Sequence, residues 1–237
     1  TIGNGSFSNA KIGSDLVIPE GVTEIGTGAF YYCRGLKTIT IPSTLTSIGR
    51  NAFYECTGLE GVYISDLSAW CSITFDYYRE WDEGLYLGCW SNPLQYAGNL
   101  YLNGELIIDL VIPHSFKAFT FDGGNFKTVT FPEGISSIPS GAFRGCRGLT
   151  EIILPDSVTS IGERAFYRCT GLTSITIPDS VTSIGDDAFA VCTSLTSITI
   201  PDSVTSIEQG AFNGCESLAS VYCKPTTPPT GSYYDMF

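Results

Sequence analysis

The stretch PDSVTSIGERAFYRCTGLTSITI, residues 155–177, is followed by PDSVTSIGDDAFAVCTSLTSITI, residues 178–200, and by PDSVTSIEQGAFNGCESLASVYC, residues 201–223. These three rows are equal in length and keep proline, valine, isoleucine, alanine-phenylalanine, cysteine and leucine in one register. An internal repeat of this period is typical of a stacked array, in which each row buries its apolar side chains against its neighbours. The sequence therefore predicts a solenoid in which each row forms one coil.

Each coil divides into two extended pieces and one tight turn. Residues 172–177, LTSITI, alternate apolar and polar side chains and are rich in β-branched residues, which predicts a strand. Residues 178–180 have turn chemistry, and residues 181–184, VTSI, form a second short extended piece. Residues 185–192 carry alanine, phenylalanine and cysteine at helical or 3₁₀ spacing. The predicted class is an α/β repeat dominated by β-structure.

The pattern LxxIxIPxSVTxIGxxAFxxC resembles the BspA-like leucine-rich repeat family of bacterial surface proteins. The resemblance covers most of the chain and fails mainly between Ser65 and about Gly104. It implies a leucine-rich-repeat solenoid that is secreted or displayed at the cell surface and used for adhesion. Proteins of the host matrix or of bacterial surfaces are the partners that it implies.

The repeat extends beyond the three rows, so we predict one solenoid over residues 1–237. Coils begin at Pro19 and Pro42, after a frayed or incomplete first coil over residues 1–18. Residues 65–104 form an irregular, aromatic-rich elaboration. The next proline in register, Pro113, follows Ser65 by close to two row lengths, so the array resumes in phase.

The elaboration contains its own short elements. Residues 67–71 predict a helical turn, and residues 72–75 predict a strand. Residues 100–107 predict a β-hairpin, because Asn103-Gly104 is the favoured pair for a type I′ turn.

Two other segments depart from the repeat. The coil from Pro113 reaches the next proline, Pro132, before a full row is complete, and it lacks the Ala-Phe-x-x-Cys motif. A tight turn at residues 123–125, Gly-Gly-Asn, therefore predicts a dent in that side of the array. Residues 225–237 are a proline-rich coil variant or a truncated C-terminal end, and further protein is expected to follow.

Charge and composition exclude several functions. The formal net charge of −12 argues against nucleic acid and against anionic membrane surfaces, since no basic stripe is present. No run of about 18 apolar residues predicts membrane insertion, and residues 1–6 do not look like a signal peptide. The extracellular or surface location therefore comes from the family resemblance alone.

The chain has nine cysteines. Adjacent coils about 4.8 Å apart would bring the repeated cysteines near disulfide range, but a column of buried thiols acting as small hydrophobes is the favoured interpretation. Cys71 and Cys89 fall outside the register, and a bridge between them stays open. The repeat position is held by Cys33, Cys56, Cys146, Cys169, Cys192 and Cys215.

The sequence shows no catalytic motif and predicts neither an enzyme nor a cofactor. It has a single histidine, His114, and no Ser-His-Asp set, HExxH, P-loop or CxxC. The carboxylates of Asp76, Asp82, Glu83 and Asp109 have no spacing that selects a glycosidase pair.

One acidic residue follows the proline position in most coils. A divalent cation could relieve the repulsion in this column, but calcium needs six to eight oxygen ligands. Solvated turn-forming residues are therefore the favoured interpretation, and we predict no metal site. The column consists of Glu20, Asp66, Glu133, Asp156, Asp179 and Asp202.

The aromatic cluster of the elaboration is the main candidate binding site. Aromatic residues with polar groups are enriched at binding hot spots, and planar rings stack on sugars. The alternative is that most of them form the core of the elaboration, with Trp81 the best candidate for exposure. The candidates are Trp70, Tyr77, Tyr78, Trp81, Tyr86 and Trp90.

A smaller basic set on the turn edge is favoured as a solvated surface. Its members are Arg144, Arg147, Arg164 and Arg168.

The leading functional hypothesis is a non-catalytic protein-binding module of adhesion type, which makes multivalent contacts along an extended surface. The alternative is a carbohydrate-binding or glycan-anchoring module that uses residues 70–101.

Overall fold

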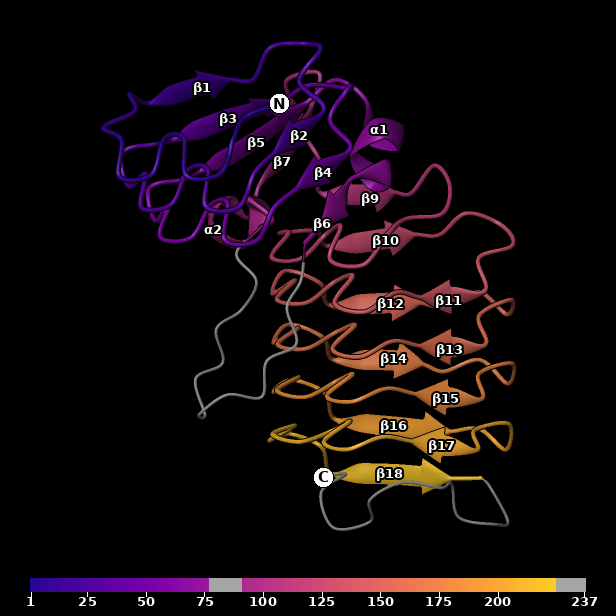
Figure 1. Ribbon diagram of the computed structural model, residues 1–237. Helices are drawn as coiled ribbons and strands as arrows, with labels where there is room; N and C mark the ends of the chain where they lie inside the picture. The colour runs from indigo at the N-terminus through magenta and orange to yellow at the C-terminus, as the bar shows by residue number, and fades with distance from the viewer. Residues whose placement is uncertain (77–90, 225–237) are drawn as a thin grey trace. The chain divides into compact units, whose positions relative to one another are not determined.

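Coils stacked through parallel strands build both parts of the chain. The computed structural model describes residues 1–76 and 91–224. The chain divides into two units, Thr1–Ile107 and Ile108–Phe237. Figure 1 shows that each unit is a stack of coils with strands on two sides. The predicted solenoid, with one coil for each row, is confirmed.

The first unit carries a five-stranded sheet on one side and a three-stranded sheet on the other. Neighbouring strands are parallel except for the last pair of the larger sheet. The larger sheet has the order β1 (Asp15–Val17), β3 (Thr38–Ile41), β5 (Gly61–Ile64), β7 (Leu100–Leu102) and β8 (Glu105–Leu106). The smaller sheet consists of β2 (Glu24–Ile25), β4 (Ser47–Ile48) and β6 (Thr74–Phe75).

The elements predicted within the elaboration are confirmed. Helix α1 spans Leu67–Ser72, and the Asp66 carboxylate caps it by accepting hydrogen bonds from two backbone N–H groups. Strands β7 and β8 form an antiparallel hairpin, and Asn103 and Gly104 both have positive φ, as a type I′ turn requires. A further helix, α2 (Leu94–Ala97), was not predicted.

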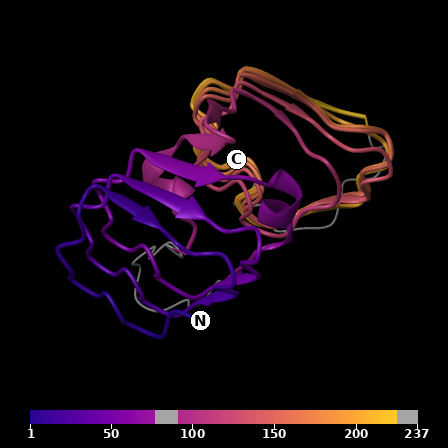
Figure 2. The same cartoon turned by 90° about the horizontal axis from the view of Figure 1, so that it is seen from above.

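The second unit repeats the same arrangement. Figure 2 shows that its coils nest closely over one another. Strand pairing is parallel, and Ile161, Ile184 and Ile207, which pair in register, hold the same position in successive rows. One side carries β9 (Asp109–Val111), β10 (Thr128–Thr130), β12 (Glu151–Ile153), β14 (Ser174–Thr176), β16 (Ser197–Ile200) and β18 (Ser220–Cys223). The other side carries β11 (Ser137–Ile138), β13 (Ser160–Ile161), β15 (Ser183–Ile184) and β17 (Ser206–Ile207).

A column of phenylalanine rings runs through the core of each unit. In the second unit, the rings of Phe143, Phe166, Phe189 and Phe212 stack with centroids 5.6, 5.2 and 5.5 Å apart. All four side chains are buried. Equivalent side chains of successive coils therefore share one interior, which confirms the predicted stacking.

The column of the first unit begins in its first coil. The Phe7 ring stacks on Phe30 at 5.4 Å, and Phe30 stacks on Phe53 at the same distance. Ile2 forms a parallel bridge with Ile25. Residues 1–18 are thus an ordered, incomplete coil rather than a frayed one.

The short coil from Pro113 keeps the core filled. Phe121 stacks on Phe143 at 5.6 Å and continues the phenylalanine column. Gly124 takes the place of the repeated cysteine, and a Cβ added there would lie 2.1 Å from the Phe126 ring. Phe126 is fully buried and fills this space. The predicted dent is therefore wrong, because aromatic rings replace the missing side chains.

The tight turn of each coil is not a helix or a 3₁₀ turn, contrary to the prediction. Residues 164 and 168 have φ of 53° and 60°, so left-handed residues four positions apart interrupt any helix. Their N–H groups donate to carbonyls of the next coil, as Arg164 does to Asp186 at 2.8 Å. A helix would use these groups internally, whereas this edge needs them to join coils. The left-handed pairs are Gly28 and Tyr32, Asn51 and Glu55, Gly141 and Gly145, Arg164 and Arg168, Asp187 and Val191, and Gly210 and Gly214.

The repeated cysteines are free thiols, as the favoured interpretation predicts. The Cys169 Sγ donates a hydrogen bond to the Phe143 carbonyl at 3.1 Å, and Cys192 does the same to Phe166 at 3.2 Å. Burial raises the pKa of Cys56 to about 12, which keeps its thiol protonated. Cys71 is also buried, and Cys89 lies outside the described residues.

Candidate binding surface

The outward side of β9, β10, β12, β14, β16 and β18 is the largest regular surface of the second unit; we call it the strand face. Alternate residues point inward, so Leu110 and Ile152 are buried while their neighbours are exposed. Val111, Ile153 and Tyr222 have exposed fractions of 62, 71 and 61%. These three side chains are the large apolar groups that the strand face exposes to solvent.

These apolar residues belong to one row that crosses the strands. Val111 pairs with Thr130, Ile153 pairs with Thr176, and Tyr222 pairs with Thr199. Neighbouring strands are about 4.8 Å apart, so the apolar groups are separated by about 10 and 14 Å along the row. A second row begins with Asp109, Thr128 and Glu151 and continues with serines. The strand face thus combines spaced apolar groups with an acidic margin.

The corresponding face of the first unit is aromatic. Tyr63 and Tyr101 pair in register, and their rings stack at 4.5 Å with planes 7° apart. A Cβ at Gly61 would lie 3.1 Å from both rings. The glycine therefore leaves room for the two rings to lean over the strand.

The turn edge of the first unit carries a second aromatic group, the edge tyrosines Tyr31, Tyr32 and Tyr54. Their three ring centroids lie 4.7 to 5.7 Å apart, with Tyr31 stacked on Tyr54. The Arg34 guanidinium lies 4.8 Å from the Tyr32 ring centre and pairs with Glu55 at 2.9 Å. Such ring pairs and cation–π contacts hold the group in a fixed arrangement.

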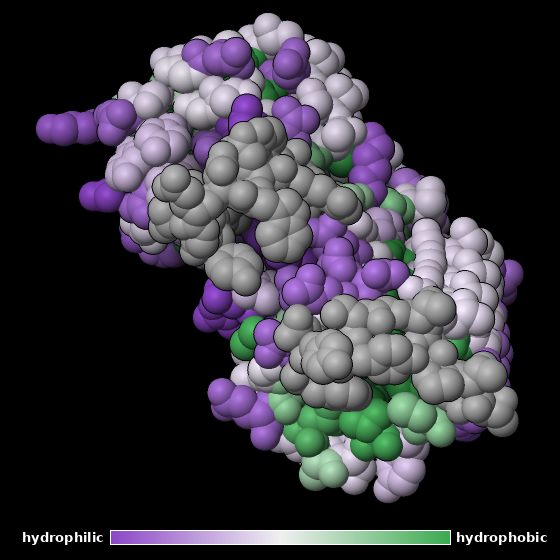
Figure 3. Space-filling model, turned by 60° about the horizontal axis from the view of Figure 1, so that its bottom comes forward, coloured by the Kyte–Doolittle hydropathy of each residue, from purple (hydrophilic) through white to green (hydrophobic). Residues whose placement is uncertain are grey.

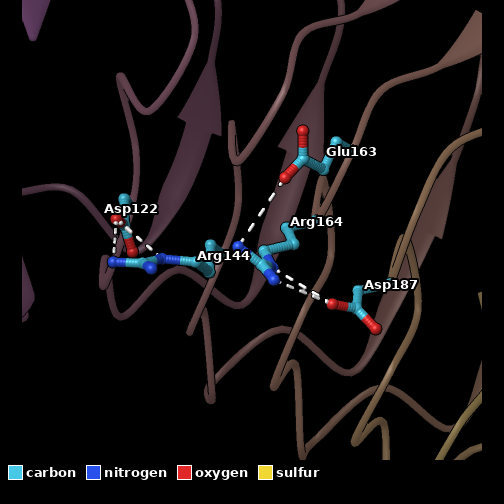
Figure 4. Close-up of polar contacts among 5 residues, drawn as sticks. All are labelled: Asp122, Arg144, Glu163, Arg164 and Asp187. Atoms are coloured by element: carbon cyan, nitrogen blue, oxygen red, sulfur yellow. Dashed lines mark hydrogen bonds and ion pairs between the residues drawn. The ribbon is translucent and has the colours of Figure 1, made fainter. Parts of the chain in front are cut away.

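The predicted basic set is largely neutralised. Arg144 pairs with Asp122 at 2.9 Å, in a pair that is mostly buried. Arg164 pairs with Asp187 at 3.0 Å and with Glu163 at 3.6 Å, as Figure 4 shows. The pairs of Arg144 with Asp122 and of Arg164 with Asp187 join successive coils, so they stabilise the turn edge rather than form an anion site.

The remaining two arginines of the set, Arg147 and Arg168, are exposed. The Arg168 guanidinium lies 5.2 Å from the Tyr167 ring centre.

Threonines at one position of successive coils, Thr159, Thr182 and Thr205, form hydrogen bonds between the coils. The hydroxyl of Thr182 donates to the Thr159 carbonyl at 3.1 Å, and that of Thr205 donates to Thr182 at 3.2 Å. Each hydroxyl thus bonds to the preceding coil. These columns are therefore inter-coil ladders.

Of the aromatic candidates in the elaboration, the structure describes Trp70, and its side chain is buried. Trp70 is only 1% exposed and packs edge-on against Phe75 at 5.4 Å. It is a core residue, because α1 turns it inward against β6, so it is removed from the candidate site. Tyr77, Tyr78, Trp81, Tyr86 and Trp90 lie outside the described residues.

Members of the acidic column form separate contacts with different partners. Glu20 accepts from Ser43, Asp66 caps α1, and Asp179 lies 3.7 Å from Lys224. Over residues 1–76 and 91–224, no group of three or more histidines, cysteines and carboxylates is placed to hold a metal ion. His114 contacts the neighbouring Ser115 carbonyl at 2.6 Å.

A shallow hollow of about 320 Å³ lies at the last described coil of the second unit. Figure 3, which looks toward this end, shows hydrophobic residues gathered there. Phe212, Leu218 and Val221 are among its lining residues. These are core positions of the repeat, so the hollow marks the end of the apolar interior.

In the part of the chain that the structure describes, neither helix has the length and apolar character needed to cross a membrane.

Coils that stack through parallel strands on two sides, most of them one repeat in length, define a leucine-rich-repeat solenoid. The model of the BspA-type leucine-rich repeat region matches residues 1–83 and 114–233 in six copies. The chain belongs to this family.

Two bacterial leucine-rich repeat proteins of known structure are similar to this chain. A leucine-rich cell surface protein from Faecalibacterium prausnitzii is 28% identical with a TM-score of 0.63, over 94% of this chain and 63% of that one. The present chain therefore spans less than two thirds of its length. A leucine-rich repeat protein from Eubacterium ventriosum is 22% identical with a TM-score of 0.45, over 96% of this chain and 69% of that one. A search among curated proteins finds no match.

Sequence reasoning missed the apolar row of the strand face and the edge tyrosines. The signal was available in departures from the repeat at outward positions. Ile153 stands where the following coils carry Thr176 and Thr199, and Tyr31 stands where later coils carry arginine, tyrosine, alanine or asparagine.

Proposed function

We propose that this chain is a non-catalytic, extracellular or surface-displayed adhesion module that binds proteins through the strand face. The single observation that carries the proposal is the exposure of Val111, Ile153 and Tyr222 at equivalent positions along the stacked strands of the second unit. Apolar and aromatic anchors on a pre-organised surface give affinity without a large ordering cost. Family membership and the surface protein from Faecalibacterium prausnitzii support the location.

The chemistry of the face favours a partner with both apolar and basic groups. Asp109 and Glu151 lie beside the apolar row, and the whole chain carries a net charge of −12. Complementary positive charge would accelerate association and orient the partner. Proteins of the host matrix or of bacterial surfaces are the partner classes to test.

The test measures binding of the purified chain to immobilised matrix proteins and to bacterial surface proteins by interferometry. Ile153→Asp places a charge at the centre of the apolar row and is expected to weaken binding at least tenfold. Val17→Asp is the matched control, because Val17 is 68% exposed on the sheet of the first unit. Equal loss in both variants, or no loss in either, would contradict the proposal.

A deletion separates this function from carbohydrate binding by the elaboration. Removing residues 76–90 is expected to leave protein binding unchanged, because the strand face lies on coils of the second unit. Loss of protein binding in a deletion variant whose circular dichroism is unchanged would move the site to the elaboration.

A further inference from the structure

The edge tyrosines of the first unit form a packed group of three rings at the surface. Tyr31 stacks on Tyr54 at 5.0 Å with planes 16° apart, so one face of the Tyr31 ring is turned toward its neighbouring coil. Tyr32 lies against Tyr31 at 4.7 Å and closes one side of the ring. Both Tyr31 and Tyr32 are half-buried and reach the surface.

The other face of the Tyr31 ring is turned toward the first coil. Residues 7–9 stack on this part of the next coil, since the Phe7 ring lies on Phe30 and the Asn9 N–H donates to the Tyr31 carbonyl at 2.7 Å. Ser8 therefore takes the position that Tyr31 and Tyr54 take in their coils. A serine covers less of an aromatic face than a tyrosine does, so we infer that this side of the half-buried Tyr31 ring is accessible, with the exposed Ser8 and Asn9 beside it.

The polar groups near Tyr31 form hydrogen bonds in defined directions, and their charges sum to about zero. The Asn9 carboxamide donates to the Ser8 hydroxyl at 3.1 Å, and both residues are exposed. The charge of Arg34 is balanced by Glu55, its ion-pair partner. A strongly charged peptide would gain little here.

A flat apolar ring with hydroxyl and amide groups at its border matches a neutral sugar ring. A pyranose has one face of C–H groups and a rim of hydroxyls that both donate and accept hydrogen bonds.

We propose that Tyr31, with Ser8, Asn9 and Tyr32 around it, binds a neutral saccharide. The pyranose ring lies on the open face of Tyr31, and the polar border holds its hydroxyls. This site is distinct from the strand face and from the tryptophan-rich elaboration, and it does not depend on the proposed protein-binding function.

The experiment uses the full chain and two sources of neutral sugar. An array of glycoprotein oligosaccharides, neutral and sialylated, forms one arm, and soluble fragments of bacterial wall glycan form the other. Chitotriose, maltotriose and lactose serve as defined probes in saturation-transfer NMR. At least one neutral saccharide is expected to bind, and the arm in which it occurs identifies the source.

Three variants decide whether Tyr31 is the contact. Tyr31→Ala is expected to weaken saccharide binding at least tenfold, and Tyr31→Phe is expected to retain most of it because the ring remains. Tyr167→Ala is the matched control, because Tyr167 holds the equivalent position in the second unit and should not affect binding. Thermal unfolding of each variant confirms that it is folded.

Several outcomes would overturn the proposal. Binding by no neutral saccharide, binding of sialylated glycans alone, or full binding by Tyr31→Ala would each do so. Equal loss in the alanine and phenylalanine variants would show that the ring face is not used. A Tyr31→Ala variant that loses a protein partner instead of a sugar would assign the patch to protein binding.

Discussion

Replacing Phe30 with alanine tests the stacking of coils directly. Phe30 is fully buried, and its ring has a phenylalanine of each neighbouring coil stacked on it at 5.4 Å. Truncating a buried phenylalanine to alanine costs about 3–5 kcal/mol, through lost transfer free energy and the cavity that remains. Each aromatic pair adds about 0.5–1.5 kcal/mol beyond its buried area, so the value is expected near the upper end of this range.

Phe7 provides the matched comparison within the same column. Its ring stacks on Phe30 but is 44% exposed. Losing about half of its burial and one ring contact should cost about 1–2 kcal/mol in the free energy of unfolding. The two variants should therefore differ by about 2 kcal/mol or more.

The assay is urea unfolding followed by circular dichroism, with hydrogen exchange of the Ile25 and Ile48 amides as a readout of the first unit. The slope of free energy against urea should stay constant between the variants, so that a shifted midpoint reports stability. An equal loss in Phe7→Ala and Phe30→Ala, or a larger one in Phe7→Ala, would refute the claim that coils are held together by this column.

Three further predictions concern the backbone and the thiols. Val191 has φ of 61°, a costly conformation for a β-branched residue. Val191→Gly should therefore raise the free energy of unfolding by about 1 kcal/mol, whereas Ala190→Gly should lower it by about the same amount. Urea unfolding measures both changes. A Cβ at Gly185 would lie 2.7 Å from backbone of the preceding coil, so Gly185→Ala should lower the melting temperature, with a cost of about 1–3 kcal/mol; an unchanged melting temperature would contradict the close approach. Burial raises the pKa of Cys56 from 9.0 to about 12, so the thiol of the unfolded chain ionises at a lower pH than that of the folded chain. The free energy of unfolding should therefore fall from pH 9 toward pH 12. In Cys56→Ala, urea unfolding across this pH range should show a smaller fall in that free energy.

The sequence predicted what each coil buries more accurately than how each coil turns. Phe143, Phe166 and Phe189 lie in a column because a strict repeat length forces equivalent side chains into one interior. The turn was predicted as helical because alanine, phenylalanine and cysteine have helical spacing. That spacing is equally compatible with a ribbon of turns, and only the need to hydrogen-bond the next coil decides between them.

The candidate site was harder to predict for a related reason. A tryptophan such as Trp70 has the same composition signal whether it forms a core or a contact, and the burial of its side chain on α1 decided the matter. Ile153 was a clearer indication of the surface, because it is an exposed apolar residue at a strand position where the following coils carry threonine. Comparing outward positions between coils would have found it.

The close match between successive coils has a consequence for how such a chain changes length. Because the contacts between one coil and the next are nearly the same along residues 155–223, a gene segment encoding one row can be duplicated or lost without creating a junction of a new kind. The shortened row from Pro113 shows that even an imperfect copy is accommodated when rings replace the missing side chains. Reach can thus be adjusted by recombination in steps of one row, about 4.8 Å each, while the residues that contact a ligand change independently on the outside.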